Sequence, residues 1–316
     1  MIKKVSLILL FFIAIQQLKA QIVKTTLPDT TAVSRWEKVN KVGLDFTQIA
    51  FVNWSAGGNN SISGLVKGHF IRGYKYNNMK WNSELIMRYG LNKQENQDVR
   101  KTDDVILLNS TIGYRKDSIS NWFYGGKFTF QTQFANGYSY PNVEKAISRF
   151  FAPAYVFVGI GAEYARKDLG FTIYLSPLTQ KTTLVLDKRL SNEGAFGVEK
   201  AIYDTDGTLL RSGGKSRTEL GALITGQFKR EIAKNMVLDT RATLYSDYIN
   251  KFGNIDVDWF SNIEMTVNKY VKANVGLHII YDDDIKSKKE ENGTQVTRGP
   301  KIQLKQIIGV GVLYTF

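Results

Sequence analysis

The chain contains no cysteine and only five prolines. The absence of cysteine excludes disulfide bonds as a source of stability. A low proline content, combined with 27 glycines and 12% aromatic residues, is typical of strands joined by tight turns. We find no Pro/Ser-rich linker and no break in composition that would divide the chain into separate domains.

Long hydrophobic runs are also missing once the first 20 residues are set aside. A membrane helix needs about 20 consecutive apolar residues, and no later segment provides them. If the protein resides in a membrane, it must therefore be a closed β-barrel. Only helices and closed barrels satisfy every backbone hydrogen bond inside lipid.

The N-terminus has the pattern of a secretory signal peptide. Lys3 and Lys4 precede an apolar run at 5–15 that is too short to span a bilayer, and Ala20 ends the segment with a small side chain. We expect residues 1–20 to be removed, which lowers the net charge from +13 to +10. Export argues against nucleic acid as a partner, so the excess charge indicates a solvated surface or basic loops that contact lipopolysaccharide phosphates.

The last segment, residues 299–316, alternates apolar and polar side chains with a period of two, which predicts a strand. Only Gln306 interrupts the apolar face. The segment ends with Val312, Tyr314 and Phe316 on that face, which resembles the signal that bacterial outer-membrane barrels present to their assembly machinery. A half-buried strand in a soluble sandwich is the alternative interpretation.

Eleven earlier segments show the same alternation and are bounded by turn residues. With the last segment, the predicted strands are 41–52, 61–76, 79–91, 103–115, 122–134, 152–165, 169–176, 216–231, 236–248, 255–268, 271–281 and 299–316. The connections after even-numbered strands are short, whereas most of those after odd-numbered strands are long. Bacterial outer-membrane barrels sort their loops in this way.

We therefore predict an all-β fold, a closed antiparallel transmembrane β-barrel of about 12 strands with short periplasmic turns and long extracellular loops. Residues 21–40 would form a periplasmic lead-in, residues 41–316 the barrel, and 177–215 an extended extracellular loop. Trp54, Trp81, Trp122 and Trp259 lie near strand ends, as expected of aromatic side chains at the membrane interface. The predicted location is the cell outer membrane.

The polar faces of the predicted strands are rich in ionisable side chains, which we expect to face the lumen. They could line a passage or a binding cavity, or they could form salt bridges that brace the barrel. Twelve strands fall between filled barrels of about eight strands and open channels of about 16–18. The candidates are Glu84, Arg88, Lys127, Asp239, Arg241, Asp247, Asp256, Asp258, Glu264, Lys272, His278 and Lys305.

Catalysis is the weaker hypothesis for this lumen. The only histidines are His69 and His278, and the sequence contains no G-x-S-x-G motif to supply a nucleophile. The run of aspartates at 282–284 reads as a solvated charged loop better than as a metal site. We expect no catalytic residue, no metal and no cofactor.

Several segments resemble an uncharacterised outer-membrane family of Bacteroidota, domain of unknown function 3078. One is the loop motif formed by Asn53, Trp54, Gly57, Gly58 and Asn60. The others are Lys101-Thr102-Asp103-Asp104, Ile147-Ser148-x-Phe150-Phe151-x-Pro153-Ala154, Leu175-Ser176-Pro177-Leu178, Asn268-Lys269-Tyr270, Tyr281-Asp282-Asp283-Asp284 and Gly309-Val310-Gly311. A departure is Gln306, where the family's last strand would carry an acidic residue.

The resemblance implies an outer-membrane barrel and no particular activity. Our leading hypothesis is a non-enzymatic barrel whose lumen admits or binds small solutes of unknown identity. The alternative is a barrel with a closed lumen that acts through its extracellular loops as a scaffold, adhesin or accessory subunit. A barrel lipid hydrolase or acyltransferase is the third hypothesis. The expected partners are outer-membrane lipid, lipopolysaccharide and the barrel assembly machinery.

Overall fold

The computed structural model describes residues 34–49, 60–250, 252–282, 286–291 and 294–316. The chain divides into two units, Met1–Ser34 and Arg35–Phe316, and the second unit contains every element described below. The predicted signal peptide therefore lies outside the described residues. So do four residues of the predicted loop motif, namely Asn53, Trp54, Gly57 and Gly58.

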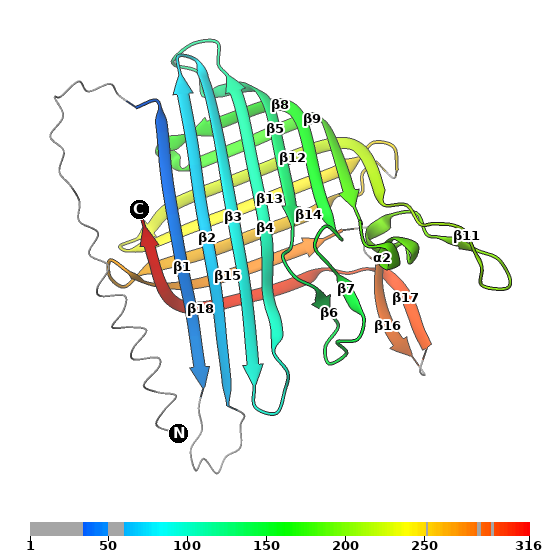
Figure 1. Cartoon of the computed structure of the whole chain (residues 1–316). Helices are drawn as coiled ribbons and strands as arrows, with labels where there is room; N and C mark the ends of the chain where they lie inside the picture. The colour runs from blue at the N-terminus through cyan, green and yellow to red at the C-terminus, as the bar shows by residue number, and fades with distance from the viewer. Residues whose placement is uncertain (1–33, 50–59, 251, 283–285, 292–293) are drawn as a thin grey trace. The chain divides into compact units, whose positions relative to one another are not determined.

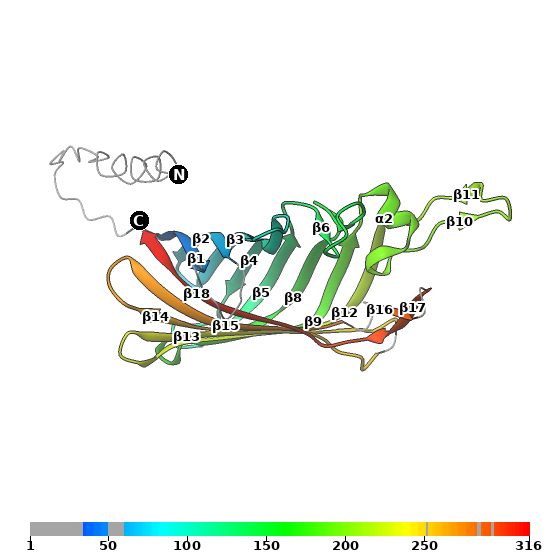
Figure 2. The ribbon, with the colours of Figure 1, turned by 90° about the horizontal axis from the view of Figure 1, so that it is seen from below.

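Twelve antiparallel strands in the described part of the chain close into a barrel (Figures 1 and 2), as predicted. In sequence order they are β1 (Trp36–Ile49), β2 (Ser61–Tyr76), β3 (Met79–Gln94), β4 (Arg100–Tyr114), β5 (Trp122–Thr132), β8 (Ala154–Arg166), β9 (Phe171–Leu184), β12 (Ser216–Ala233), β13 (Met236–Asp247), β14 (Asp256–Thr266), β15 (Val271–Tyr281) and β18 (Gln303–Thr315).

The first and last strands of the barrel close the sheet. β1 pairs with β18 in a register that places Lys41 opposite Thr315 and Asp45 opposite Gly311. The Phe316 backbone N–H donates to the Asn40 carbonyl at 3.0 Å, and the Asn40 side-chain amide donates to the Phe316 carbonyl at 3.0 Å. The five residue pairs from Lys41–Thr315 to Asp45–Gly311 join the two strands and close the ring.

The connections are sorted by length between the two ends of the barrel, as predicted. Residues 77–78, 115–121, 167–170, 234–235 and 267–270 connect the strands at one end, which we call the short-turn end. Asn77 and Asn235 have positive φ angles of 49° and 63°, which suits two-residue hairpin turns. One short turn contains the 3₁₀ helix η1 (Lys167–Leu169).

The opposite end, which we call the long-loop end, carries the remaining secondary structure (Figure 1). A small core of Ala152, Val185, Leu190 and Val198 is buried there. The elements are β6 (Gly137–Tyr138), β7 (Ala146–Ser148), α2 (Lys188–Asn192), the 3₁₀ helix η2 (Ala195–Gly197), β10 (Ile202–Tyr203), β11 (Leu209–Arg211), β16 (Lys286–Glu291) and β17 (Thr294–Pro300). None of the helices in the described ranges is long and apolar enough to cross a membrane.

Several predicted boundaries are wrong by a few residues, and the two largest differences concern the predicted lead-in and the predicted long loop. β1 begins at Trp36, so the barrel includes the last residues assigned to the lead-in at 21–40. β9 continues to Leu184, so the loop predicted at 177–215 begins eight residues later.

The β9 error has a physical cause at Pro177. The pairing register of β9 shifts beside this residue with both neighbouring strands. A bulge tolerates proline, which lacks the N–H that a regular ladder needs. Beyond the bulge, Thr179, Lys181 and Thr183 are buried while Gln180 is exposed. Both faces are polar, so the alternation that identifies a strand disappears from the sequence.

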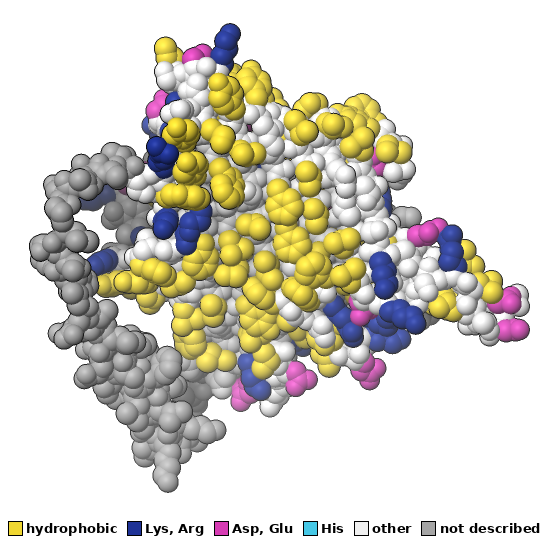
Figure 3. Space-filling model, turned by 45° about the horizontal axis from the view of Figure 1, so that its top comes forward, with side chains coloured by type: hydrophobic (Ala, Val, Ile, Leu, Met, Phe, Trp, Pro, Cys, Tyr) yellow, Lys and Arg dark blue, Asp and Glu magenta, His cyan; other side chains and the backbone are white. Residues whose placement is uncertain are grey.

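The outer face of the barrel is apolar. Val66, Ile160 and Ile308 are 61%, 68% and 80% exposed. Figure 3 shows hydrophobic side chains over most of the strand surface turned to the viewer, with charged side chains gathered toward its edges. Side chains at alternate strand positions thus separate into an apolar outer set and a polar inner set.

Tryptophans on the outer face satisfy the few polar groups beside them. The Trp81 indole N–H donates to Ser110 Oγ at 2.8 Å, and the Trp259 N–H donates to Thr240 Oγ1 at 2.9 Å. Near the short-turn end, Trp36 packs against Tyr74 and Trp81 with ring centroids 4.9 and 6.1 Å away. Aromatic side chains therefore concentrate near a strand end.

Candidate functional site

The interior of the barrel is the candidate site, because charged side chains from strands that are not neighbours meet there. Figure 2 shows β2, β3 and β4 on one side of the interior and β13, β14 and β15 on the other. A side chain that contacts a strand several positions away around the ring must point into the lumen. This criterion identifies the luminal residues independently of exposure.

The contact between Glu84 and Arg241 crosses the lumen. Glu84 lies on β3 and Arg241 on β13, and five strands separate them in either direction around the ring. Arg241 Nη1 donates to Glu84 Oε2 at 2.8 Å, and the two side chains are 25% and 15% exposed. The lumen is therefore bridged along its width at this level.

Two further residues hold this bridge in place. Asp239 Oδ1 accepts from Arg241 Nε at 3.1 Å, and His69 Nε2 lies 2.6 Å from Glu84 Oε1. Arg241 thus has a carboxylate on its own strand and one on the opposite wall. Bidentate and charge-assisted contacts of this kind orient the guanidinium.

A second set of contacts spans the lumen between β3, β4, β14 and β18. Arg88 Nε donates to Asp103 Oδ2 at 2.9 Å, and Lys305 Nζ lies 3.0 Å from Asp103 Oδ1. The Arg88 guanidinium also lies 5.6 Å from the centre of the Phe260 ring on β14. Together with the Glu84–Arg241 bridge, these side chains fill part of the interior.

The remaining sequence candidates pair in smaller groups along the wall. Asp258 lies 2.8 Å from His278, Lys272 lies 3.7 Å from Glu264, and Lys181 lies 2.7 Å from Asp256. Asp247 accepts the backbone N–H of Ile249. Lys127 donates to Thr225 Oγ1 at 2.6 Å.

Sequence reasoning missed several members of this network. Asp45 pairs with Lys67 at 2.8 Å, Lys80 pairs with Glu163, and Lys181 lies 3.6 Å from Glu219. Asp45 falls between the exposed Leu44 and Phe46, so alternation alone could have identified it. Lys181 had no such signal, because apolar and polar residues do not alternate in the part of β9 that follows the bulge beside Pro177.

The two histidines are each bound to a carboxylate, His69 to Glu84 and His278 to Asp258. Among the described residues, neither histidine ring has a serine or threonine hydroxyl as a recorded hydrogen-bond partner. A Ser–His pair would require such a contact. Each ring is therefore held by a carboxylate of a neighbouring strand.

The residues of the predicted assembly signal lie together on the outer face of β18. Val312, Tyr314 and Phe316 are all exposed, and the rings of Tyr314 and Phe316 stack with centroids 5.7 Å apart. Of the loop motif, Asn60 is described, and its side-chain amide donates to Glu95 Oε2 at 2.9 Å. Asn60 thus ties the end of that loop to the end of β3.

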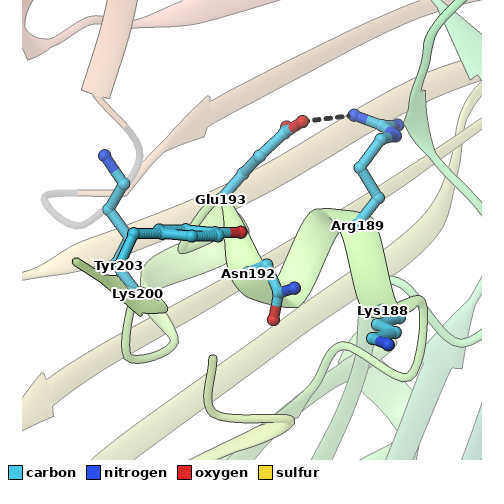
Figure 4. Close-up of a pocket in the computed structure, with 6 residues that line it drawn as sticks. All are labelled: Lys188, Arg189, Asn192, Glu193, Lys200 and Tyr203. Carbon is cyan, nitrogen blue, oxygen red and sulfur yellow. Dashed lines mark hydrogen bonds and ion pairs between the residues drawn. The ribbon is translucent and has the colours of Figure 1, made fainter. Parts of the chain in front are cut away.

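A separate pocket of about 480 Å³ opens on α2 at the long-loop end. Arg189 Nη1 donates to Glu193 Oε1 at 2.8 Å on its rim (Figure 4). The residues that line the pocket are Lys188, Arg189, Asn192, Glu193, Lys200 and Tyr203. The lining thus combines three cationic side chains and one carboxylate with an aromatic ring.

Part of the chain is similar to a known protein family. A family model described as protein of unknown function (DUF3078) matches residues 46–138, a range that includes two of the resembling segments. The search of curated proteins gave no match.

Solved structures that are similar to the chain include three from bacterial outer membranes or autotransporters. The translocator domain of the autotransporter NalP from Neisseria meningitidis has 12% identity and a TM-score of 0.37, over 91% of this chain and 90% of that one. An outer membrane channel from Pseudomonas putida F1 has 10% identity and a TM-score of 0.40, over 92% and 100%. The β domain of the Bordetella autotransporter BrkA has 9% identity and a TM-score of 0.31, over 90% and 100%.

Proposed function

We propose that this chain, which over residues 46–138 matches the model of a family of unknown function (DUF3078), is an outer-membrane barrel that passes small solutes through a constricted lumen. The observation that carries the proposal is the bridge between Glu84 and Arg241, set inside a barrel with an apolar exterior. The bridge narrows the lumen, and the charged walls keep the remaining space wet. The proposal includes no catalytic residue.

The apolar exterior supports a membrane location. A side chain such as Ile160 or Ile308 would gain about 1.5–3 kcal/mol on transfer from water to an apolar surrounding. The bound hydroxyls of Ser110 and Thr240 also suit lipid, which offers no hydrogen-bond partner of its own. With export by residues 1–20, this exterior favours the outer membrane, where Val312, Tyr314 and Phe316 would serve assembly.

The charged lumen supports a narrow passage. The interior of an eight-stranded barrel is just wide enough to be filled by side chains, and a porin of 16–18 strands leaves an aqueous channel. A barrel of twelve strands has an interior of intermediate width. Cross-lumen contacts at Glu84–Arg241 and Arg88–Phe260 divide that space. Small hydrated solutes would pass beside these side chains or when the bridge opens.

The test is conductance of the purified protein in planar lipid bilayers. We expect small single-channel currents from the native protein. The double variant Glu84→Gln, Arg241→Gln removes the bridge without leaving one charge alone, and we expect it to conduct at least about two-fold more. This factor reflects a bridge that spans the lumen and limits its narrowest section.

The matched control removes an equivalent ion pair outside the lumen. Arg166 and Asp168 pair at 2.6 Å in a short turn, and the double variant Arg166→Gln, Asp168→Asn should leave the conductance unchanged. If neither the native protein nor the bridge variant passes current at any voltage, the passage is rejected.

A second candidate function is favoured by the structure at the long-loop end. The buried core beneath α2 holds a cationic pocket in a defined shape, which suits a barrel with a closed lumen that binds a partner outside. If neither the native protein nor the Glu84→Gln, Arg241→Gln variant conducts, this second function is favoured over the passage. Deletion of 202–211, which removes Tyr203 from the pocket, would then abolish partner binding while the barrel still folds.

A further inference from the structure

Luminal cations in the described strands are almost all paired with carboxylates. The pairs on record are Lys67–Asp45, Lys75–Glu37, Lys80–Glu163, Arg88–Asp103, Lys181–Asp256, Arg217–Glu219, Lys229–Asp239, Arg241–Glu84, Lys272–Glu264 and Lys305–Asp103. Pairing of this kind offsets the cost of removing charge from bulk water. A luminal cation without such a partner therefore needs an explanation.

Lys127 is the clearest exception in the described part of the chain. It is the central residue of β5, and no described carboxylate oxygen forms an ion pair with its ammonium group. The two acids that face it, Glu84 and Glu163, are bound to Arg241 and Lys80. Lys127 therefore has two carboxylates in its surroundings, both bound to other cations, and no ion pair of its own among the described residues.

The Lys127 ammonium has a hydroxyl and an aromatic ring from two other strands as its neighbours. Its Nζ donates to Thr225 Oγ1 on β12 at 2.6 Å, and lies 5.6 Å from the centre of the Tyr174 ring on β9. The Lys127 side chain as a whole is partly buried. Three strands thus contribute to one small site in the middle of the barrel wall.

The Lys127 ammonium and the Thr225 hydroxyl have hydrogen-bond donors that can bind a ligand. An ammonium group has three N–H donors, and Thr225 takes one of them. Because Thr225 Oγ1 accepts from Lys127, its own O–H proton remains free to donate elsewhere. Two N–H groups and one O–H group can then converge on the same negatively charged oxygen.

We propose that Lys127 and Thr225 form a subsite for a small oxyanion of the carboxylate or phosphate type. This inference rests on the proposed function, because the lumen must admit a small solute for the site to fill. An ionisable side chain within the membrane-spanning part of a barrel marks a solute pathway by default, and lysine favours anions. The bound oxyanion supplies the counter-charge that no carboxylate provides.

Lys41 provides a matched control. It also lacks a carboxylate partner among the described residues, but it lies near the short-turn end, where it pairs in register with Thr315, away from the Thr225 hydroxyl. Replacing it removes the same formal charge from the lumen without touching the Thr225 hydroxyl. Any effect of luminal charge alone will therefore appear in both variants.

The test measures binding of inorganic phosphate and of acetate to the detergent-solubilised barrel, through the rise in its unfolding temperature. We expect both anions to stabilise the native protein. In Lys127→Gln the apparent affinity should fall at least about ten-fold, in Thr225→Val it should fall less, and in Lys41→Gln it should stay unchanged. Equal anion stabilisation of the native protein and the Lys127→Gln variant overturns the subsite.

Failure of the subsite and failure of the passage give different results. If the native barrel conducts but Lys127→Gln binds phosphate normally, the subsite is wrong and the passage stands. If neither barrel conducts but only the native protein and Lys41→Gln bind phosphate, the subsite stands without a through-passage. Should Lys127→Gln fail to fold, a normal phosphate affinity in Thr225→Val overturns the proposal.

Discussion

The outer and inner faces of the same strands follow opposite rules. On the outer face, single apolar side chains such as Ile160 are exposed and independent of one another. On the inner face, charged side chains are partly buried and depend on partners from distant strands, as Arg241 depends on Glu84. The comparison teaches that outer positions are constrained by their solvent and inner positions by their neighbours.

The largest change in stability is expected when a charge is placed on the outer face. Ile160 lies at the centre of β8, and we expect Ile160→Lys to destabilise the barrel in lipid vesicles by about 2–4 kcal/mol, because lysine at the bilayer midplane loses its hydration. Denaturant titration of the folded barrel measures this. Ile119 is 89% exposed in a short turn, so Ile119→Lys should have no effect. Equal stability of both variants would remove the lipid-facing assignment.

The second test disturbs the inner face. Arg241→Gln leaves the Glu84 carboxylate with one fewer donor, and we expect a loss of about 1–3 kcal/mol. Adding Glu84→Gln removes the carboxylate that Arg241→Gln leaves without its donor. The loss of unfolding free energy in the double variant should therefore be smaller than the sum of the losses in the two single variants. Denaturant titrations of the native protein, the two single variants and the double variant complete this double-mutant cycle. Strictly additive losses would show that the bridge does not couple the two walls.

A smaller effect is expected where a polar group lies on the apolar face. Trp259→Phe removes the donor to Thr240 Oγ1 and should cost about 1 kcal/mol in vesicles. Thr240→Val in the same chain should restore most of this loss, because both polar groups are then gone. Trp122→Phe is the control, since no described hydroxyl accepts from its indole. A cost as large at Trp122 would contradict the account.

The smallest effect lies outside both faces, in the exposed turn after β8. The hydrogen bond from Arg166 lowers the pKa of Asp168 to about 2. The unfolded value is about 4, so the stabilisation by this pair is complete above about pH 4 and is lost as the pH falls through about 2. Unfolding midpoints of the native protein and Asp168→Asn should therefore converge in acid. A gap that widens in acid would reverse the assigned sign.

Much of the fold could be predicted because alternation is local. Val310, Val312 and Tyr314 alternate with Gly309, Gly311 and Leu313, and the structure exposes the first set while the second is partly buried. The order of short and long connections likewise follows from turn residues such as Asn77 and Asn78. The resemblance to the family is supported over residues 46–138.

The partners of the luminal charges could not be predicted in the same way. Glu84 and Arg241 are 157 residues apart, and nothing in either segment marks the other. Their contact depends on the pairing register of every strand between them. The bulge at Pro177 also changes the phase of β9, which is why Lys181 was assigned to a loop.

The amino-acid sequence by itself determined the number of barrel strands, the face to which side chains point in the regular strands and the end at which each loop lies, because these depend on a two-residue period and on turn chemistry. The tertiary structure alone decided that Arg241 reaches across to Glu84 and that Lys127 is left with a hydroxyl instead of a carboxylate. The reason is that closure of the sheet sets which inward positions meet, and closure depends on the whole chain.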